Sequence, residues 1–254
     1  MRPRIRAHRR ARSRSVAGLI AVTMLLAASL PTAEARARAG SLEPGLFDPA
    51  LAEPWSTRFA AGIFLAIEPA DETGAIPPAL PGLTVNLRTA LPAGFRLLAA
   101  LEGNLVNNAV SAGLGWSTDL DDHWSVMVSD RVPLAFGYAN GFGLSTNTWI
   151  LGNQPGVRIG YAWNDVRISL DLSVTLDLER KAYVGNETIT DSHPPTLGGA
   201  QGLLMIENLA RDDGGHLYYG VALQYQQAGS KVFWVFSDVD NAVLYPRLEV
   251  GYVF

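Results

Sequence analysis

The chain contains no cysteine, and only 17% of its 254 residues are charged. The absence of cysteine excludes disulfides, thiolate metal ligands, cysteine nucleophiles and a lipid-anchored cysteine. Charged residues make up about a quarter of an ordinary soluble domain, so this chain is unusually poor in charge for that class. With 48% hydrophobic residues and a net charge of only −4, it is also too apolar to be an intrinsically disordered chain.

The first 39 residues have the organisation of a secretory signal peptide. Residues 1–14 contain seven arginines and no acid, and an apolar segment of about 15 residues follows. Small residues at Ala35, Ala37 and Ala39 offer alternative cleavage sites. The apolar segment is shorter than the ~20 residues of a spanning helix, and its presence argues against a nucleic-acid-binding arm. We therefore expect residues 1–39 to direct export through the inner membrane.

Cleavage changes the charge of the chain. Residues 1–35 hold seven of the 20 basic residues and one of the 24 acidic residues, so 13 basic and 23 acidic residues remain. A mature chain this acidic is not expected to bind nucleic acid. Residues 40–54 are punctuated by proline and glycine, which predicts an irregular periplasmic lead-in before a single domain over 55–254.

Apolar and polar residues alternate strictly along much of the mature chain. In residues 166–179, every second residue from Val166 to Leu178 is apolar, and those between them are charged or hydroxylic. A strand separates these two sets onto opposite faces, whereas a helix would mix them. The same alternation predicts strands over 56–68, 83–91, 94–106, 109–118, 156–163, 216–227 and 243–254, and less regularly over 123–138 and 201–210.

A soluble β-sandwich also alternates, and the placement of the aromatic residues argues against it. They lie on the apolar faces of the strands, next to tight turns or chain ends. Side by side they would form the aromatic girdle that marks one membrane interface of a transmembrane barrel. The predicted girdle consists of Trp55, Phe95, Trp116, Trp124, Trp163, Tyr219, Tyr252 and Phe254.

The last seven residues, Leu248–Phe254, alternate and end on phenylalanine, with an aromatic residue at Tyr252. This ending resembles the signal that assembly machinery reads in bacterial outer-membrane β-barrel proteins, although Gly251 lies further downstream than the glycine of that signal. The resemblance extends over residues 55–254 as an architecture and singles out no family. It implies a transmembrane antiparallel β-barrel in the outer membrane of a Gram-negative cell. It also implies outer-membrane lipid and, through Phe254, the barrel-assembly machinery as partners.

Outer-membrane barrels normally have an even number of strands, short periplasmic turns and longer outer loops. If the turns beside the aromatic residues are periplasmic, the outer connections are 69–82, 107–108, 139–155, 180–200 and 228–242. This arrangement predicts ten strands with both chain ends in the periplasm. Further strands at 144–152 and 231–237 would give twelve, but the long connection 180–200 would then be periplasmic.

The polar faces of the predicted strands carry charges of both signs. Seven arginines are expected to face the interior: Arg58, Arg88, Arg96, Arg131, Arg158, Arg167 and Arg247. Six acids accompany them: Glu68, Glu102, Asp171, Asp177, Glu179 and Glu249. Buried charges must be paired, and these numbers nearly balance. They therefore favour a salt-bridged core in a narrow barrel over a ring of one sign, and they leave room for a thin water path.

Residues with catalytic potential are few. Asp121, His123 and Ser125 lie close together, with Asp119 two residues before Asp121. The His-x-Ser pair resembles part of the lipid A deacylase signature, and the Asp-x-Asp and Asp-x-His pairs resemble those of omptin proteases. Both enzyme types work near the outer face, however, whereas strand parity places this cluster in a periplasmic turn. His216, after two glycines, is expected in a loop.

No cofactor is expected, because the sequence has no glycine-rich phosphate loop leading from a strand into a helix. Asp238 and Asp240 offer oxygen ligands but fall short of a calcium-loop pattern, so no metal site is predicted. The sequence therefore predicts a non-enzymatic, porin-like barrel. It would be either a narrow channel for small solutes or a sealed barrel with acidic outer loops. An outer-membrane hydrolase is the alternative.

Overall fold

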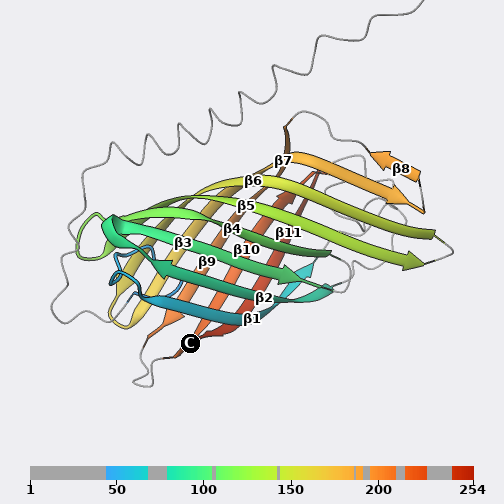
Figure 1. The fold of residues 1–254 in the computed structure, drawn as a ribbon. Coiled ribbons are helices and arrows are strands. Elements are labelled where there is room, and N and C mark those ends of the chain that lie inside the picture. Colours follow the sequence, from blue (N-terminus) through green and yellow to red (C-terminus); the bar gives the residue numbers. More distant parts are fainter. Residues whose placement is uncertain are drawn as a thin grey trace, which may run out of the picture. The chain divides into compact units, whose positions relative to one another are not determined.

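The computed structural model describes residues 44–67, 79–104, 107–141, 144–185, 187–190, 195–209, 215–227 and 242–254 (Figure 1). The predicted signal peptide, Glu68, Asp238 and Asp240 lie outside these residues. Within the described residues, no helix is long and apolar enough to cross a membrane.

The described residues form one antiparallel sheet. Its strands are β1 (Thr57–Ile67), β2 (Ala79–Ala90), β3 (Phe95–Gly103), β4 (Asn107–Asp119), β5 (Trp124–Gly141), β6 (Leu144–Trp163), β7 (Val166–Val184), β8 (Glu187–Thr190), β9 (Thr196–Asn208), β10 (His216–Gln226) and β11 (Val243–Val253). A short 3₁₀ turn at Pro92–Gly94 joins β2 to β3.

The sheet closes on itself to form a barrel. Each strand pairs with the next along the chain, except that β7 pairs with β9 and that β11 returns to β1. The short strand β8 pairs with the far end of β7 and stands outside the ring. The ring therefore has ten strands, as the sequence predicts. The twelve-strand alternative is wrong because residues 144–152 continue into 156–163 as the single strand β6.

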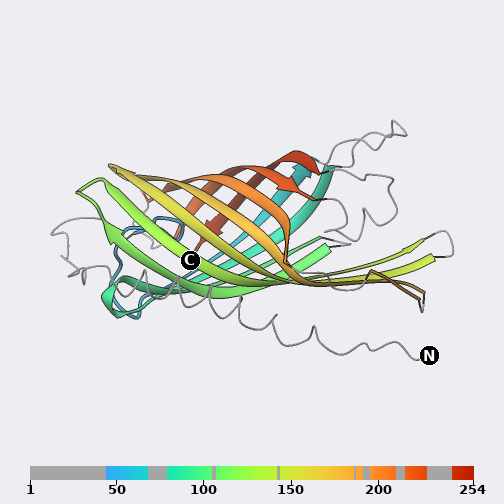
Figure 2. The same ribbon diagram turned by 90° about the horizontal axis from the view of Figure 1, so that it is seen from above.

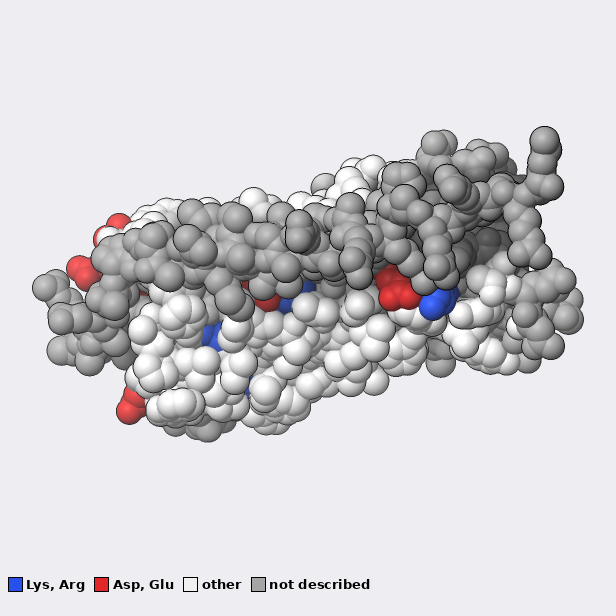
Figure 3. All heavy atoms as spheres, turned by 45° about the horizontal axis from the view of Figure 1, so that its top comes forward, with Lys and Arg blue, Asp and Glu red and all other residues white. Residues whose placement is uncertain are grey.

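The wall of the barrel is apolar outside and polar inside. Large hydrophobic side chains such as Ile63, Leu83 and Val221 are exposed on the outer surface. Figure 3 shows a face made largely of uncharged residues, with acidic groups at one end and a few acidic and basic groups part-way along. The alternating inward residues include buried arginine, glutamate, serine and threonine. This inversion of the soluble pattern is what a barrel immersed in lipid requires.

Four strands reach further toward the outer rim than the alternation predicts. β5 extends to Gly141 and β6 begins at Leu144, so most of the predicted outer connection 139–155 is strand. β7 likewise extends to Val184 and β9 begins at Thr196, which shortens the connection 180–200. Figure 2 shows β5, β6 and β7 running on past the rim of the barrel. Threonine, tryptophan and isoleucine favour strand in these extensions, but glycine, asparagine and proline interrupt the alternation there.

Most of the predicted aromatic girdle is exposed at one end of the barrel. Trp55, Phe95, Trp124, Trp163, Tyr219 and Phe254 are among the exposed large hydrophobic residues. Trp116 differs, because its side chain is buried and its indole N–H donates to the carbonyl of Ala93 at 3.2 Å. Tyr252 is half-buried beside the Phe254 ring, at 4.9 Å between centroids.

The ring places both described chain ends and the short turns at the same end of the barrel, which is the periplasmic end in such proteins. We therefore expect an epitope inserted at Gly185, between β7 and β8, to bind antibody on intact cells. An epitope inserted at Asn164–Asp165 should bind only after permeabilisation. Immunofluorescence on the two tagged chains measures this, and the reverse labelling would contradict the orientation.

Candidate functional site

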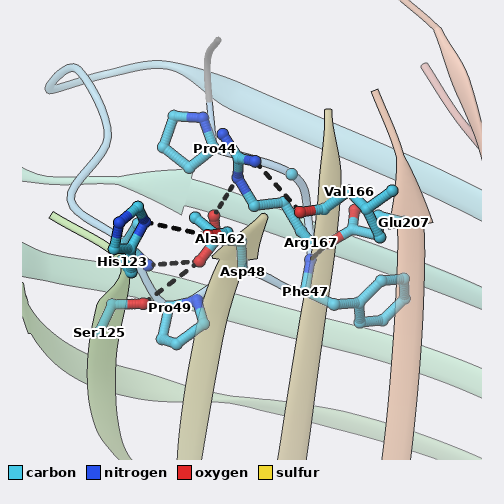
Figure 4. Close-up of polar contacts among 12 residues, drawn as sticks. Pro44, Phe47, Asp48, Pro49, His123, Ser125, Ala162, Val166, Arg167 and Glu207 are labelled. Atoms are coloured by element: carbon cyan, nitrogen blue, oxygen red, sulfur yellow. Dashed lines mark hydrogen bonds and ion pairs between the residues drawn. The ribbon is translucent and has the colours of Figure 1, made fainter. Parts of the chain in front are cut away.

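The segment before β1 lies inside the barrel rather than beyond it. Residues 44–51, here called the plug segment, occupy the periplasmic end of the lumen, and Leu46, Phe47, Asp48 and Ala50 are buried. Figure 4 shows this segment among side chains from several strands. The sequence predicts a periplasmic lead-in over 40–54, whereas the structure places residues 44–51 of this segment in the lumen, enclosed by the barrel.

Two arginines hold the plug segment by its backbone. Arg88 on β2 donates to the carbonyl oxygens of Pro44, Gly45, Leu46 and Asp48. Arg96 on β3 donates to those of Asp48, Pro49 and Ala50. Both guanidinium groups are buried and need hydrogen-bond acceptors. The carbonyl groups of the plug segment, which pair with no strand, supply them. The wall therefore recognises the main chain of this segment.

A carboxylate binds the amide groups of the same segment. Glu207 on β9 accepts hydrogen bonds from the backbone N–H of Leu46 at 2.7 Å and of Phe47 at 2.9 Å. Its Oε1 also lies 3.0 Å from Nε2 of His216, the first residue of β10. His216 is buried and lies in a strand, as the predicted bounds 216–227 require, so the separate expectation that it lies in a loop is wrong. The plug segment thus meets donors on one side of the lumen and an acceptor on the other.

Asp48 adds a side-chain contact between the plug segment and the wall. Its Oδ2 lies 3.1 Å from Nε of Arg167 on β7, and its Oδ1 accepts from the Ser125 hydroxyl on β5 at 3.3 Å. Oδ1 also accepts from the backbone N–H of Ala50 at 2.9 Å. Burial raises the pKa of this carboxyl, while the Ala50 amide and the Arg167 guanidinium act in the opposite direction. One side chain therefore ties the plug segment to β5 and β7.

Apolar contacts complete the fit. The Phe47 ring packs against Tyr218 with centroids 4.9 Å apart, and the Arg158 guanidinium lies 5.8 Å from the centre of the Phe47 ring. Pro49 lies over Gly160, where an added Cβ would come within 2.4 Å of the proline Cδ. Glycine is therefore needed at position 160 because the plug segment approaches the wall so closely there.

Above the plug segment, a charged cluster crosses the lumen. Arg247 on β11 donates to Glu102 on β3 at 2.8 Å and to Glu249 at 2.8 Å. Tyr218 donates to Glu249 at 3.0 Å, and the Phe64 ring centre lies 4.0 Å from the Arg247 guanidinium. Since β3 and β11 are separated by β1 and β2 in the ring, the Arg247–Glu102 pair spans the interior.

The outer half of the lumen is a polar cavity of about 280 Å³. Phe47 lies at its periplasmic end, and its wall combines apolar side chains with amides, among them Asn86, Gln154, Gln201, Gln224 and Gln226. Its charged lining consists of Glu102, Arg131, Arg158, Asp171, Arg247 and Glu249. Arg158 pairs with Asp171 at 2.9 Å. The buried Nε of Arg131 has no hydrogen-bond partner among the described residues.

The structure brings most of the predicted interior charges together in these two layers. Arg88, Arg96 and Arg167 contact the plug segment, and Arg131, Arg158 and Arg247 line the cavity above it. Asp177 lines a second, smaller cavity near the outer end. Arg58 is half-buried on β1, directly opposite Arg88.

Glu179 differs from the prediction of an inward position. It is paired with the outward-facing Leu151 and forms an ion pair with Lys181 at 3.2 Å, and Lys181 lies over the Trp149 ring. A bulge at Leu178 shifts the register by one residue. Beyond it, β7 residues that the alternation would place in the interior face outward instead.

The residues with catalytic potential do not converge. The His123 ring lies 3.2 Å from the Ala162 carbonyl oxygen, and Asp121 accepts hydrogen bonds from the backbone N–H of His123 and Trp124. The Ser125 hydroxyl points into the lumen toward Asp48 (Figure 4). His123 and Ser125 therefore serve separate contacts. Within the described part of the chain, no cluster of three or more histidine, aspartate or glutamate residues could hold a metal ion.

Comparison with solved structures finds outer-membrane barrels. A KdgM porin matches at 12% identity and a TM-score of 0.36, covering 78% of this chain and 98% of that one. A NanC porin matches at 8% identity and a TM-score of 0.41, covering 78% of this chain and 98% of that one. The translocator domain of the autotransporter NalP from Neisseria meningitidis matches at 12% identity and a TM-score of 0.39, covering 98% of this chain and 99% of that one.

The chain has the fold of an outer-membrane β-barrel. This rests on the closed ring of ten strands and its lipid-facing apolar wall, since matches at these TM-scores are too distant to carry an activity. No family model and no curated protein matches the chain. Sequence reasoning missed Asp48, Glu207 and His216 as lumen residues. The alternation of His216, Tyr218 and Gly220 against Leu217 and Tyr219 is the one signal that could have placed His216 in the interior.

Proposed function

We propose that this barrel is a narrow outer-membrane channel for small polar solutes, and that the plug segment holds it closed at the periplasmic end. The observation that carries this proposal is the division of the lumen into two parts. The outer half is a polar cavity of about 280 Å³, and the periplasmic half is filled by Leu46, Phe47 and Asp48. A lumen built only for rigidity needs no cavity of this size, because close-packed interiors have few voids larger than a water molecule.

The lining of the cavity indicates the kind of solute. Three arginines and three acids balance in charge, and five of these six side chains already form ion pairs: Arg158 with Asp171, and Arg247 with both Glu102 and Glu249. The amide groups around them offer both donors and acceptors. Such a surface favours neutral or zwitterionic polar solutes over a simple ion of one sign.

The test is single-channel recording of the refolded mature chain in a planar bilayer, beside a variant that lacks residues 44–51. We expect the mature chain to be closed most of the time and the shortened variant to give steady conductance steps. Heat-modifiable electrophoretic mobility provides the control that both chains form barrels. A folded but silent shortened variant would show that the cavity is sealed in its own right and would overturn the proposal.

A further inference from the structure

The strand pairing between β5 and β6 is interrupted over two residues. The ladder between these strands runs regularly to Arg131 opposite Gln154 and resumes only at Leu134 opposite Leu151. Val132 and Pro133 on β5, and Gly152 and Asn153 on β6, have no ladder partners across this gap. These four residues are called the β5–β6 seam. Proline lacks the N–H that a ladder needs, and in a closed barrel it has no free edge to occupy.

A second interruption adjoins the first. Between β6 and β7, pairing runs from Asn153 opposite Leu176 to Gly156 opposite Ser173 and leaves Gln154 and Pro155 without partners on β7. Other strand prolines do not have this effect: Pro81 and Pro246 lie near strand ends, and pairing continues in register through both. The unpaired positions therefore gather around residues 152–155 of β6, with adjacent breaks on both of its sides.

The lipid-facing side of the seam is polar. Asp130 points outward between the exposed Val128 and Val132, and Asn153 donates to its Oδ1 at 2.6 Å. Asp130 lies six residues after Trp124 and eight before Tyr138, the exposed aromatic residues at the two ends of the apolar part of β5. It is therefore near mid-membrane. Ionisable groups at that depth on a lipid-facing wall are rare and mark functional positions.

The lumen side of the seam faces the polar cavity. Pro133 and Gln154 line the cavity, together with Arg131, whose buried Nε has no hydrogen-bond partner among the described residues. The seam itself is closed by contact: a Cβ on Gly152 would lie 3.1 Å from Cγ of Pro133. Strands held by packing without ladder hydrogen bonds separate more easily than paired strands.

We propose that the β5–β6 seam is a lateral entrance from the membrane into the lumen for a single-chain amphiphile with an anionic head. The head would reach Arg131 in the cavity, and the chain would remain in the gap toward lipid. The hydrogen-bonded Asp130–Asn153 pair marks the point at which such a molecule would cross the otherwise apolar wall. Because Phe47 closes the cavity below, this route is independent of the periplasmic gate.

The test uses a diazirine-bearing palmitate as a photoreactive probe, dissolved in vesicles that contain the barrel. We expect mass spectrometry to locate the crosslinks on lumen-facing residues of the seam region, in particular Arg131 and Gln154. A cysteine pair at Val132→Cys and Asn153→Cys, made in a chain that has no other cysteine, can close the seam by a disulfide. Lumen labelling should be lost on oxidation and return on reduction.

One control pair, two further variants and a second probe test the proposal further. A pair at Val128→Cys and Val157→Cys, which are direct partners in the intact ladder below the seam, should leave labelling unchanged when oxidised. The variant Pro133→Val restores a backbone donor without any cysteine and should also lose lumen labelling. A palmityl alcohol probe, which lacks the charge, should label less than palmitate, and Arg131→Gln should remove that difference. Crosslinks confined to lipid-facing residues, or lumen labelling that survives the oxidised seam, would overturn the proposal.

Discussion

Replacing Arg88 and Arg96 together with methionine is expected to release the plug segment from the lumen. The two guanidiniums donate seven hydrogen bonds to carbonyl oxygens of residues 44–50. Hydrogen bonds to charged groups contribute about 1.5–3 kcal/mol each. About 1.4 kcal/mol corresponds to a tenfold change in an equilibrium constant. Losing even two of these contacts therefore lowers the ratio of bound to released plug segment by orders of magnitude.

The measurement is the labelling rate of a single cysteine, Ala50→Cys, by a maleimide reagent supplied from the periplasmic side. In the background with both arginines the cysteine is buried and should react slowly, and in the double methionine variant it should react on the order of a hundredfold faster. Arg180→Met is the matched control, because Arg180 lies far along β7 from the plug segment. Equal rates in the two backgrounds would show that the arginines do not hold the segment.

Gly251→Val is expected to prevent closure of the barrel. Gly251 on β11 is directly opposite Gly62 on β1, and the Tyr218 side chain covers both. A Cβ at position 251 would lie 2.4 Å from the carbonyl oxygen of Ala61 and 2.5 Å from Cε1 of Tyr218. The first of these atoms is backbone of the partner strand and cannot turn aside. We expect a loss of at least about 3 kcal/mol, the upper end of the usual range for overpacking.

The readout is the fraction of chain that runs as the compact, heat-modifiable species after refolding. Gly202→Ala serves as the control, because the nearest atom to its added Cβ is a leucine methyl at 3.5 Å, an ordinary contact. If the valine variant folded as well as this control, β11 and β1 could move apart enough to accommodate the added side chain, and the prediction would be wrong.

The strand number and the outer wall could be predicted because each follows from local alternation. A period of two places Val166, Ile168 and Leu170 on one face whatever the rest of the chain does. The bulge at Leu178 could not be predicted in this way, since it depends on how β6 and β7 pair across the barrel. One skipped residue was enough to move Glu179 from the predicted interior to the outer face.

The plug segment was beyond the reach of sequence pattern for a different reason. Residues 44–51 have no periodicity, and the wall binds mainly their carbonyl and amide groups, which every peptide carries. The side chains that bind them come from two consecutive strands, which carry Arg88 and Arg96, and from a strand far away in sequence, which carries Glu207. A charged side chain that faces the interior must have a hydrogen-bonding or charged partner. The sequence pattern does not indicate which segment of the chain is that partner.

The plug segment is joined to β1 by only residues 52–56, and the backbone N–H of Trp55 in this linker donates to Ala90 of the wall at 2.7 Å. It therefore behaves as a peptide ligand tethered beside its own receptor. Short tethers give an effective concentration in the millimolar range. A released segment would return at a rate independent of protein concentration, so openings should be brief. A soluble peptide of the same sequence could displace it only at comparably high concentration.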